Sequence, residues 1–392
     1  MISRALLTLL CLTACGALAQ GKVTLAAALK DVRQSHTATL LKDGRVLVVG
    51  GRGADGLSTL ASCEIYEPKK NKWTACAPLT TGRSHHTATA LSDGKVLVVG
   101  GSAQQVGPDG SSRSVAIASC ELYDPRANKW SPVPAMNDAR NGHTATLLVD
   151  GSVLVVGGAR ENRLHLNSVE RFDPKTNAWT KEKPLDVARW LHSAVRDSEG
   201  NVVILGGRSN AAQKGVGSGV SIADVERFDV KTQSWKTLPP MSEPRQRTAV
   251  IAEATDARID VIGGQTATSS TNYAETWAPG AAEWKQFENN LSMSLSAHTG
   301  TWLTSGDIVV IGGEPPNAID TSRVQRWVVS LKQWCLAGEL INARKFHSAT
   351  LLDDGRILIV GGVSGGLPEK TAELWTSTQG KCEEPPGLSM GW

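Results

Sequence analysis

The sequence predicts an all-β fold made of seven repeated four-stranded units, and three observations support this prediction. A histidine stands fourteen residues before six of seven recurring glycine pairs. Two aromatic positions, seven residues apart, follow almost every pair. The pairs recur about every 50 residues, at 50/51, 100/101, 157/158, 206/207, 263/264, 312/313 and 361/362. Such units bury their apolar faces against their neighbours, so the repeat determines the fold.

The first half of each repeat predicts a hairpin. In the first copy, His36 opens a short run that ends at Asp43-Gly44, and Val46 to Val49 follow before the glycine pair. Asp-Gly favours the positive φ angles of a two-residue turn. The continuous β-branched run predicts a strand buried on both faces. In the fifth copy Arg247 takes the histidine's place, sixteen residues before the glycine, which implies a two-residue insertion.

The second half of each repeat predicts another hairpin, held by two aromatic residues. The first aromatic position holds Tyr66, Tyr123, Phe172, Phe228, Trp277, Trp327 and Trp375; the second holds Trp73, Trp130, Trp179, Trp235, Trp284 and Trp334, with Cys382 in the seventh copy. Their recurrence indicates packing between neighbouring repeats. Seven such four-stranded antiparallel units predict a closed seven-bladed β-propeller, with blades at about residues 34–80, 84–136, 141–185, 190–241, 245–291, 296–340 and 345–385.

A closed ring needs a strand to complete its last blade. Residues 21–29 align with the outermost strand at 71–79, so the N-terminal segment is expected to close blade seven. Residues 380–386 fit the same place, but two prolines make that stretch a poor strand.

Residues 1–20 have the features of an export signal. Arg4 precedes an apolar stretch of about eight residues, too short to span a bilayer. Ala17-Leu-Ala19 predicts cleavage before Gln20, whereas Leu12-Thr-Ala-Cys15 resembles a lipobox that would place a lipid on Cys15. We expect an exported protein, either secreted or lipid-anchored in the cell envelope, with residues 21–392 as a single domain.

The remaining cysteines fit an oxidising compartment. If Tyr66 faces Trp73 across a hairpin, Cys63 faces Cys76, which predicts a disulfide. Cys335 and Cys382 lie near the outer strands of adjacent blades and predict a second one. No cysteine and histidine spacing typical of zinc occurs.

The combined motifs resemble the kelch repeat. The residues that carry the resemblance are His-x-Ala-x-x-Leu, Asp-Gly, Val-Leu-Val-Val-Gly-Gly, Glu-x-Tyr-Asp-Pro and Trp, in register over about residues 21–385. The resemblance implies the propeller and extends to the kelch propeller of galactose oxidase. That family's copper-radical site needs a Tyr-Cys-His-His set, which cannot be transferred onto Tyr66, Tyr123 or Tyr273. We therefore expect no copper, other metal or cofactor, and no catalytic residue is assigned.

Arginines and aromatic residues are the candidate ligand contacts. The arginines either precede the repeat histidine or follow the glycine pair, so both groups are expected at one mouth of the ring, where they would favour carboxylate, sulfate or phosphate groups. The alternative is that each pairs with a carboxylate of a neighbouring blade. Blades five and six lack the arginine before the histidine. The candidates are Arg33, Arg52, Arg83, Arg140, Arg160, Arg189, Arg208 and Arg344, with Trp190 and Phe346 as exposed aromatic contacts.

These features predict a non-catalytic binding module for a protein or a glycan. The net charge of +3, with both signs interspersed, indicates no nucleic-acid partner, and a membrane would be contacted only through a lipid on Cys15. Long loops at about 102–119 and 208–224 would add recognition surface. The alternative is a carbohydrate mutarotase or epimerase, which needs an acid/base pair from the scattered carboxylates Asp138, Glu161 and Glu314.

Overall fold

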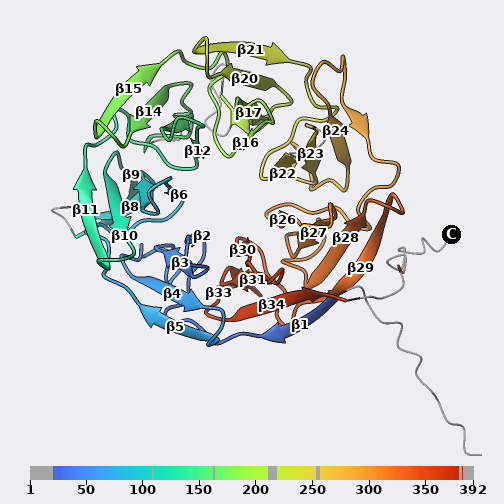
Figure 1. Cartoon of the computed structure of the whole chain (residues 1–392), viewed down its shortest axis with the longest axis horizontal. Coiled ribbons are helices and arrows are strands. Elements are labelled where there is room, and N and C mark those ends of the chain that lie inside the picture. The colour runs from blue at the N-terminus through green and yellow to red at the C-terminus, as the bar shows by residue number, and fades with distance from the viewer. Residues whose placement is uncertain are drawn as a thin grey trace, which may run out of the picture.

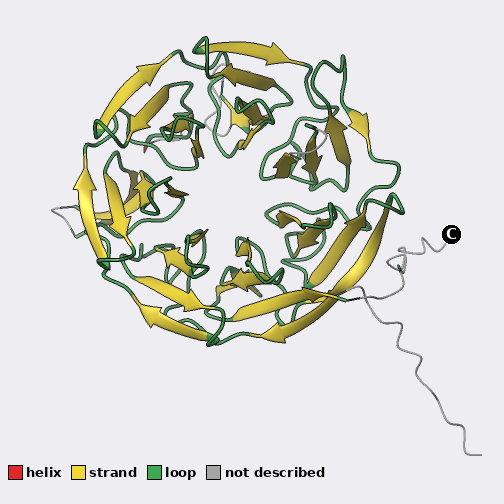
Figure 2. Ribbon diagram, viewed as in Figure 1, coloured by secondary structure: helices red, strands yellow, loops and turns green. Residues whose placement is uncertain are grey.

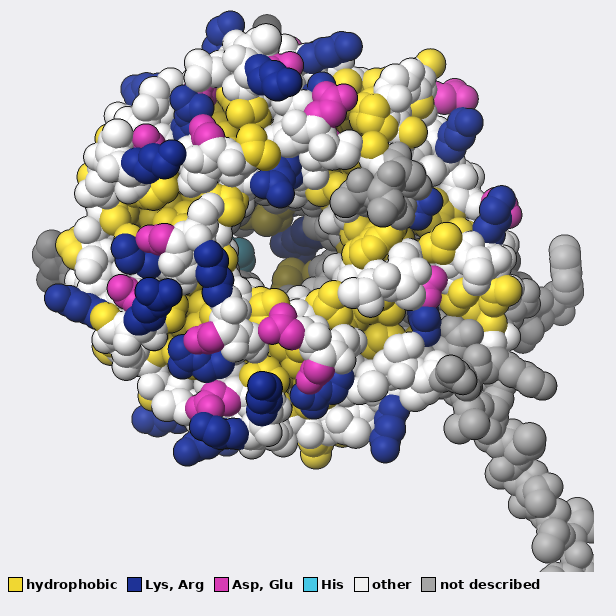
Figure 3. Space-filling model, viewed as in Figure 1, with side chains coloured by type: hydrophobic (Ala, Val, Ile, Leu, Met, Phe, Trp, Pro, Cys, Tyr) yellow, Lys and Arg dark blue, Asp and Glu magenta, His cyan; other side chains and the backbone are white. Residues whose placement is uncertain are grey.

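The protein is a seven-bladed β-propeller, as the repeats predict. The structure is a computed structural model and describes residues 21–107, 110–161, 164–210, 219–252, 257–378 and 382. Seven four-stranded antiparallel sheets stand as blades around a central axis (Figures 1 and 2). The centre of the ring is open, and basic and acidic side chains are interspersed around it (Figure 3). Among the described residues, no helix is long and apolar enough to cross a membrane.

The first three blades run from the axis outward in chain order. Blade one contains β2 (Thr37–Leu40), β3 (Val46–Val49), β4 (Cys63–Glu67) and β5 (Lys72–Ala75). Blade two contains β6 (Thr87–Ala90), β7 (Val96–Val99), β10 (Cys120–Asp124) and β11 (Lys129–Val133). Blade three contains β12 (Thr144–Leu147), β13 (Val153–Val156), β14 (Val169–Asp173) and β15 (Ala178–Glu182).

The next three blades repeat this order. Blade four contains β16 (Ser193–Arg196), β17 (Val202–Leu205), β20 (Val225–Asp229) and β21 (Ser234–Leu238). Blade five contains β22 (Ala249–Ala252), β23 (Ile259–Ile262), β24 (Ala274–Trp277) and β25 (Lys285–Gln286). Blade six contains β26 (Thr299–Trp302), β27 (Ile308–Ile311), β28 (Arg323–Val328) and β29 (Gln333–Glu339).

Three loops between the second and third strands form small hairpins. The long loop of blade two is the pair β8 (Ser102–Val106) and β9 (Ser112–Ala116). In blade four β18 (Arg208–Ser209) pairs with β19 (Val220–Ser221), and residues 211–218 lie outside the described part. In blade seven β32 (Val363–Ser364) pairs with β33 (Leu367–Pro368).

Blade seven combines both ends of the chain. It contains β30 (Ser348–Leu351), β31 (Ile357–Val360) and β34 (Ala372–Ser377). Its outer strand is β1 (Gly21–Leu25), which pairs antiparallel with β34 from Gly21–Ser377 to Leu25–Glu373 (Figure 1). The N-terminal segment therefore closes the ring. The competing stretch at 380–386 lies, apart from Cys382, outside the described residues, as does the export signal at 1–20.

The core lies between the blades. All four residues of β3 are fully buried, and alternate side chains serve opposite faces. Leu47 and Val49 pack against blade two, whereas Val46 and Val48 pack against blade seven. The continuous apolar run follows from this two-sided burial, because each blade is sandwiched between two others.

The paired aromatic residues join each blade to the preceding one. Tyr66 and Trp73 lie side by side with ring centroids 4.9 Å apart. The indole N–H of Trp73 donates to the carbonyl of Ala27, and Trp130 donates likewise to Ala77 in blade one, both at 2.7 Å. The aromatic positions thus supply packing area in every blade and an inter-blade hydrogen bond in six of them. In blade six the indole nitrogen of Trp334 is buried and has no partner among the described residues.

Six buried arginines form a second link between blades. Arg83 is fully buried and donates to Glu121 at 2.8 Å and to the carbonyls of Gly100 and Ser119, all in its own blade. Its own carbonyl accepts the amide of Gly51 in the preceding blade. The other pairs are Arg33–Glu64, Arg140–Glu170, Arg189–Glu226, Arg245–Glu275 and Arg344–Glu373.

Blade six shows that the two charges of this pair depend on each other. Leu295 occupies the arginine position, and its carbonyl still accepts the amide of Gly264. Gln325 occupies the glutamate position and is equally buried. Its amide oxygen accepts the amide N–H of Ser292, as Glu121 accepts that of Thr80 in blade two. Both charges are absent together, which avoids an unpaired buried charge.

The repeat histidines form hydrogen bonds around the axis. Nε2 of His86 lies 3.0 Å from the hydroxyl of Thr37 in the preceding blade. Equivalent contacts join His143 to Thr87, His192 to Thr144, His347 to Thr299 and His36 to Ser348. Between blades four and five Ser193 contacts Thr248 instead, and His298 contacts the carbonyl of Ile262.

The glycine pair makes these contacts possible. Gly50 and Gly51 adopt φ angles of 61° and 102°, a region that favours glycine. A Cβ on Gly50 would lie 2.5 Å from the carbonyl oxygen of Arg83 and 2.9 Å from the His86 ring. The pair therefore lets the arginine and histidine of the next blade approach the backbone closely.

We expect that the leucine and glutamine of blade six can replace the arginine–glutamate pair of another blade with little loss of stability. Arg140→Leu leaves Glu170 buried without its partner and should lower the free energy of unfolding by about 3–5 kcal/mol. The double variant Arg140→Leu/Glu170→Gln should recover most of this loss. Guanidinium denaturation of the wild type and both variants measures the effect. A double variant as unstable as the single one would contradict the mutual dependence of the two charges.

The buried histidines should make the fold acid-sensitive. Burial, with Arg33 and Arg140 nearby, lowers the pKa of His36 and His143 to about 3; burial lowers that of His298 to about 4. The unfolded chain, whose histidines have a pKa of about 6.5, binds these protons first. Stability is therefore complete above about pH 6.5 and decreases as the pH falls toward 4, by at most about 1.4 kcal/mol per pH unit for each histidine.

Denaturation midpoints at pH 7.5, 6 and 5 test this dependence. His143→Thr, which copies Thr248 of blade five, should reduce the slope by about one histidine's share. Midpoints that do not change between pH 7.5 and 5 would show that these histidines do not stay neutral.

Candidate functional site

Seven residues form a ring around the axis, each directly before the histidine position of its blade. All have positive φ angles, between 52° and 57°. At six of the seven blade junctions the amide of one member donates to the carbonyl of the member in the preceding blade, at 3.0–3.4 Å. We call this set the axial ring; it consists of Ser35, His85, Gly142, Leu191, Arg247, Ala297 and Phe346.

The axial ring combines a repeated backbone with seven different side chains. The neighbouring histidine and glycine pair recur, but no two ring positions carry the same residue. Six of the seven are non-glycine residues in a left-handed conformation, which costs about 1 kcal/mol each. Backbone strain of this kind gathers at functional sites. The ring therefore gives each blade a different side chain on the same backbone.

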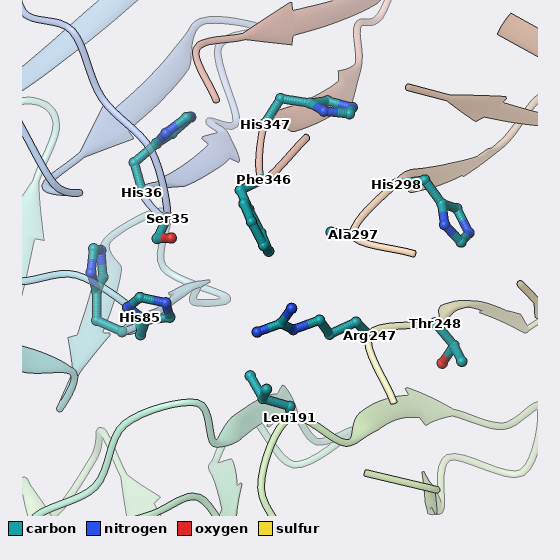
Figure 4. A pocket seen from close by; sticks show the side chains of 11 residues that line it. Ser35, His36, His85, Leu191, Arg247, Thr248, Ala297, His298, Phe346 and His347 are labelled. Carbon is teal, nitrogen blue, oxygen red and sulfur yellow. The ribbon is translucent and has the colours of Figure 1, made fainter. Parts of the chain in front are cut away.

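A cavity of about 300 Å³ opens at the axial ring. Figure 4 shows Arg247 extending between Leu191 and Phe346, with His85 on the facing side. The lining residues are Ser35, His36, His85, His86, Leu191, Arg247, Thr248, Ala297, His298, Phe346 and His347. We call this cavity the axial pocket.

Arg247 is the principal charge of the axial pocket. Its guanidinium carbon lies 5.2 Å from the centre of the Phe346 ring. Among the described residues, this guanidinium makes no hydrogen bond and no ion pair. Burial lowers its pKa, Glu314 opposes that shift, and Arg208 adds to it. Glu314 itself is paired with Lys345, so it does not neutralise Arg247 by direct contact.

Arg52 and Arg208 add positive charge beside the pocket. Arg52 bridges to Gln34 and Arg208 to Trp190, so both adjoin the chain entering the ring. Within the described residues, the Nε atoms of both are buried without a hydrogen-bond partner, as are those of the scaffold residues Arg33, Arg140 and Arg245. Nη2 of Arg208 donates to the carbonyl of Gly219 at 3.0 Å. Burial, then the charges of Arg52 and Arg247, lower the pKa of His85 to about 4. His85 is therefore neutral at pH 7.

The prediction that eight arginines crowd the mouth is wrong for five of them. Arg33, Arg83, Arg140, Arg189 and Arg344 are fully buried inside their blades. Each is paired with a glutamate of its own blade, and its carbonyl faces the preceding blade. Arg160 is exposed and paired with Asp138. Only Arg52 and Arg208 of the eight adjoin the axial pocket.

Two further arginines were misplaced by the sequence alignment. Thr248, rather than Arg247, occupies the histidine position of blade five. In blade one the second glycine of the pair, Gly51, lies against His36, and in blade five the equivalent Gly264 lies against Thr248. The insertion is therefore one residue. Arg245 then takes the buried arginine position, so blade five does not lack it, and Arg247 falls in the axial ring. The shifted Arg245-x-x-Thr248 spacing was the available signal.

Of the two aromatic residues predicted to contact the ligand, Phe346 lines the axial pocket and Trp190 does not. Phe346 is a half-buried member of the axial ring and lines the pocket. Trp190 lies over Gly142, where an added Cβ would be 2.1 Å from its indole nitrogen. Its N–H donates to Asn141 at 3.2 Å, and its ring lies 5.9 Å from that of His165. Trp190 thus packs on the axial ring at Gly142, where the glycine leaves room for it, and does not line the axial pocket.

Cys63 pairs with Cys76, as the register of β4 and β5 indicates, and Cys335 of β29 pairs with Cys382 beyond the last strand. The structure has disulfides between Cys63 and Cys76 and between Cys335 and Cys382, with Cα atoms 5.4 and 5.1 Å apart. Cys120 is buried, and burial raises its pKa to about 11. The lipidation candidate Cys15 lies outside the described residues.

The described residues do not fit a metal centre. No three histidine, cysteine, aspartate or glutamate side chains within them are grouped to hold an ion. The three candidate carboxylates do not converge either. Asp138 and Glu161 belong to blade three. Glu314 belongs to blade six, three blades further along the ring, and is paired with Lys345 of the neighbouring blade seven.

The comparisons with known proteins agree with this architecture. The family described as "KLHDC2/KLHL20/DRC7 Kelch-repeats domain" matches residues 18–187, and "Kelch motif" matches residues 198–242. No curated protein sequence matches the chain.

Two solved structures share the fold at low identity. A fungal alcohol oxidase of the AA5 family, solved with copper, superposes with a TM-score of 0.73 at 16% identity, covering 91% of this chain and 76% of its own. The structure of YjhT gives a TM-score of 0.59 at 16% identity, covering 79% and 99%. With its repeats, its seven blades and these matches, the chain belongs to the kelch-repeat propeller family.

Proposed function

We propose that this kelch propeller is an exported, non-catalytic binding module that holds an anionic group of a protein or glycan ligand in its axial pocket. The observation that carries the proposal is the half-buried guanidinium of Arg247, which has no acceptor among the described residues and points into the cavity (Figure 4). A cation partly removed from water favours a carboxylate, sulfate or phosphate that can replace its lost hydration.

The surroundings of Arg247 support the same ligand chemistry. Arg52 and Arg208 bring further positive charge to the segments that bridge to Gln34 and Trp190, directly before the axial ring. Phe346 and Leu191 flank Arg247 and provide apolar contact for the carbon skeleton that bears the anion. The ring therefore offers positive charge at its centre and apolar surface beside it, an arrangement common in ligand pockets.

The variation around the axial ring supports recognition. A repeated side chain serves every blade alike, whereas seven different side chains at one position give the pocket an asymmetric chemistry. Binding needs only this complementarity. Catalysis would need an acid and a base that meet at the ligand, and the predicted carboxylates do not do so.

Export is part of the proposal and rests on residues 1–20. The basic residue, the short apolar stretch and Ala17-Leu-Ala19 support secretion, and the Cys15 sequence supports lipid anchoring. We expect the mature chain to begin at Gln20 or at a lipid-modified Cys15. Intact mass measurement of the protein from its native cells identifies the start; a chain that still begins at Met1 would contradict export by this route.

Substitution of the central cation tests the axial pocket. Arg247→Gln should weaken binding of benzoate and of sulfate about tenfold or more, because a charge-assisted hydrogen bond is lost. Calorimetric or NMR titration measures both affinities. Arg45→Gln is the matched control. Arg45 is a partly exposed arginine that is paired with Asp43 in the turn between β2 and β3, and it does not line the axial pocket. Equal affinity in the wild type and Arg247→Gln would exclude the pocket as the anion site.

A further inference from the structure

A second cavity, of about 290 Å³, lies at the rim of the propeller between blades five and six, which stand side by side in Figure 1. It is bounded by the outer edge of blade five and by the turn that joins β28 to β29. That turn is at the opposite end of the strands from the glycine pair, so the cavity is separate from the axial pocket. We call this cavity the rim groove; its lining includes Thr276, Lys285, Phe287, Trp327, Val329 and Lys332.

The rim groove follows from the short outer strand of blade five. This strand, β25, has two residues, whereas the outer strands of the other six blades have four to seven. The chain leaves the sheet at Phe287, whose ring centroid lies 4.7 Å from that of Trp327 and 6.4 Å from that of Trp334. Phe287 is outside the two aromatic positions of the repeat. The aromatic surface of the groove therefore belongs to this junction and not to the repeated scaffold.

The turn beside the groove is apolar only in blade six among the regular blades. In blades one, two and three the turn between the third and fourth strands begins with an acidic residue and proline and ends with asparagine. In blade six the same turn reads Val328-Val-Ser-Leu-Lys332. Val329 and Leu331 are 37% and 53% exposed. Exposed aliphatic residues next to an aromatic groove are typical of a surface that another segment covers.

Two buried polar groups at this junction have no partner among the described residues. One is the hydroxyl of Thr276, which lines the groove, and the other is the indole N–H of Trp334, which packs on Phe287. In blade five the equivalent N–H of Trp284 donates to the carbonyl of Pro239 in the preceding blade. Because buried polar groups are nearly always hydrogen-bonded, the junction offers bonding positions to a further segment of chain.

The C-terminal segment starts close to the rim groove. Cys382 is bonded to Cys335 with the Cα atoms 5.1 Å apart. Cys335 follows Lys332 by three residues in the same hairpin, so the Cα of Cys382 lies within about 15 Å of that of Lys332. Residues 383–392 lie outside the described residues. Ten residues extend to about 33 Å, which is enough to pass the outer strand β29 and reach the groove.

The sequence of this segment complements the groove. It reads Glu383-Glu-Pro-Pro-Gly-Leu-Ser-Met-Gly-Trp392. The two acidic residues come first, nearest the disulfide, and the groove presents Lys285 and Lys332. Lys332 is paired with Glu288 at 2.7 Å, whereas Lys285 forms no ion pair with a described residue. The leucine, methionine and tryptophan that follow match the apolar part of the groove.

We propose that residues 383–392 occupy the rim groove of their own chain. Glu383 and Glu384 face the two lysines, and Leu388, Met390 and Trp392 cover the aromatic and aliphatic surface. The disulfide makes this contact intramolecular. A short linker gives an effective concentration on the order of millimolar, which favours the chain's own segment over a second copy or a separate partner. The proposal does not depend on the axial pocket or its ligand.

The full chain with p-benzoylphenylalanine in place of Trp392 tests this contact. Irradiation should cross-link that residue, within the same chain, to residues 285–288 or 327–332, and mass spectrometry of the digested protein locates the link. Val329→Lys should lower the yield at least fivefold, because it places a charge in the apolar part of the groove. Val149→Lys is the matched control and should leave the yield unchanged. Val149 is a 69% exposed valine in the turn between β12 and β13, outside the groove.

Charge reversal tests the acidic residues separately. Glu383→Lys/Glu384→Lys should lower the yield at least threefold, and the further change Lys285→Glu/Lys332→Glu should restore it. Thermal unfolding midpoints equal to that of the wild type show that the variants keep the fold. Four results would overturn the proposal: links to the face of the axial pocket, links between two chains, a yield that Val329→Lys does not change, or no cross-link at all.

Discussion

The buried arginine–glutamate pair is the constraint on which the rest of the propeller depends. Each arginine holds its own blade through its side chain and the preceding blade through its carbonyl. The glutamate's second oxygen accepts an amide of the segment that leads into the arginine, as in Glu121 with Thr80. One ion pair thus fixes where the chain enters each blade. Removing a single charge would leave the other buried, and blade six avoids this by replacing both.

The residues that hold the segment entering each blade are different from the residues of the axial ring that face the pocket. The backbone of the axial ring has the same left-handed conformation in all seven blades. The glycine pair is present in every blade, whereas blade six lacks the arginine and blade five lacks the histidine. The ring side chains differ from blade to blade, and those of Arg247 and Phe346 line the axial pocket (Figure 4). A propeller can therefore change its ligand chemistry at Arg247 or Phe346 without altering the contacts between blades.

The sequence predicts the architecture far better than the site. Repeats report the fold directly, because the glycine pairs and aromatic positions recur in register, and the Tyr66–Trp73 register even places Cys63 beside Cys76. The direction of a side chain is not visible in a repeat. Arg83 and Arg52 look alike as mouth residues, yet Arg83 turns into its blade because Glu121 is placed to receive it.

Arg247 was missed for a different reason. A one-residue insertion within the first hairpin of blade five shifts the count from the glycine pair, so the alignment set Arg247 on the histidine position. Counting three residues forward from Arg245 would have placed Thr248 at the histidine position, but the fifth repeat has no histidine to mark that position. Sites that lie in the one irregular repeat are the hardest to find from periodicity, since the rule that finds the others fails there.

The pairing of β1 with β34 links the order of synthesis to the completion of the fold. β1 has no pairing strand until residues 372–377 have also left the ribosome. Through most of translation, blade one is open on the side that blade seven will cover, and Val46 and Val48 are without their cover. A truncated chain lacking β34 would keep this apolar edge exposed, so cellular quality control could distinguish incomplete copies from finished ones by that surface alone.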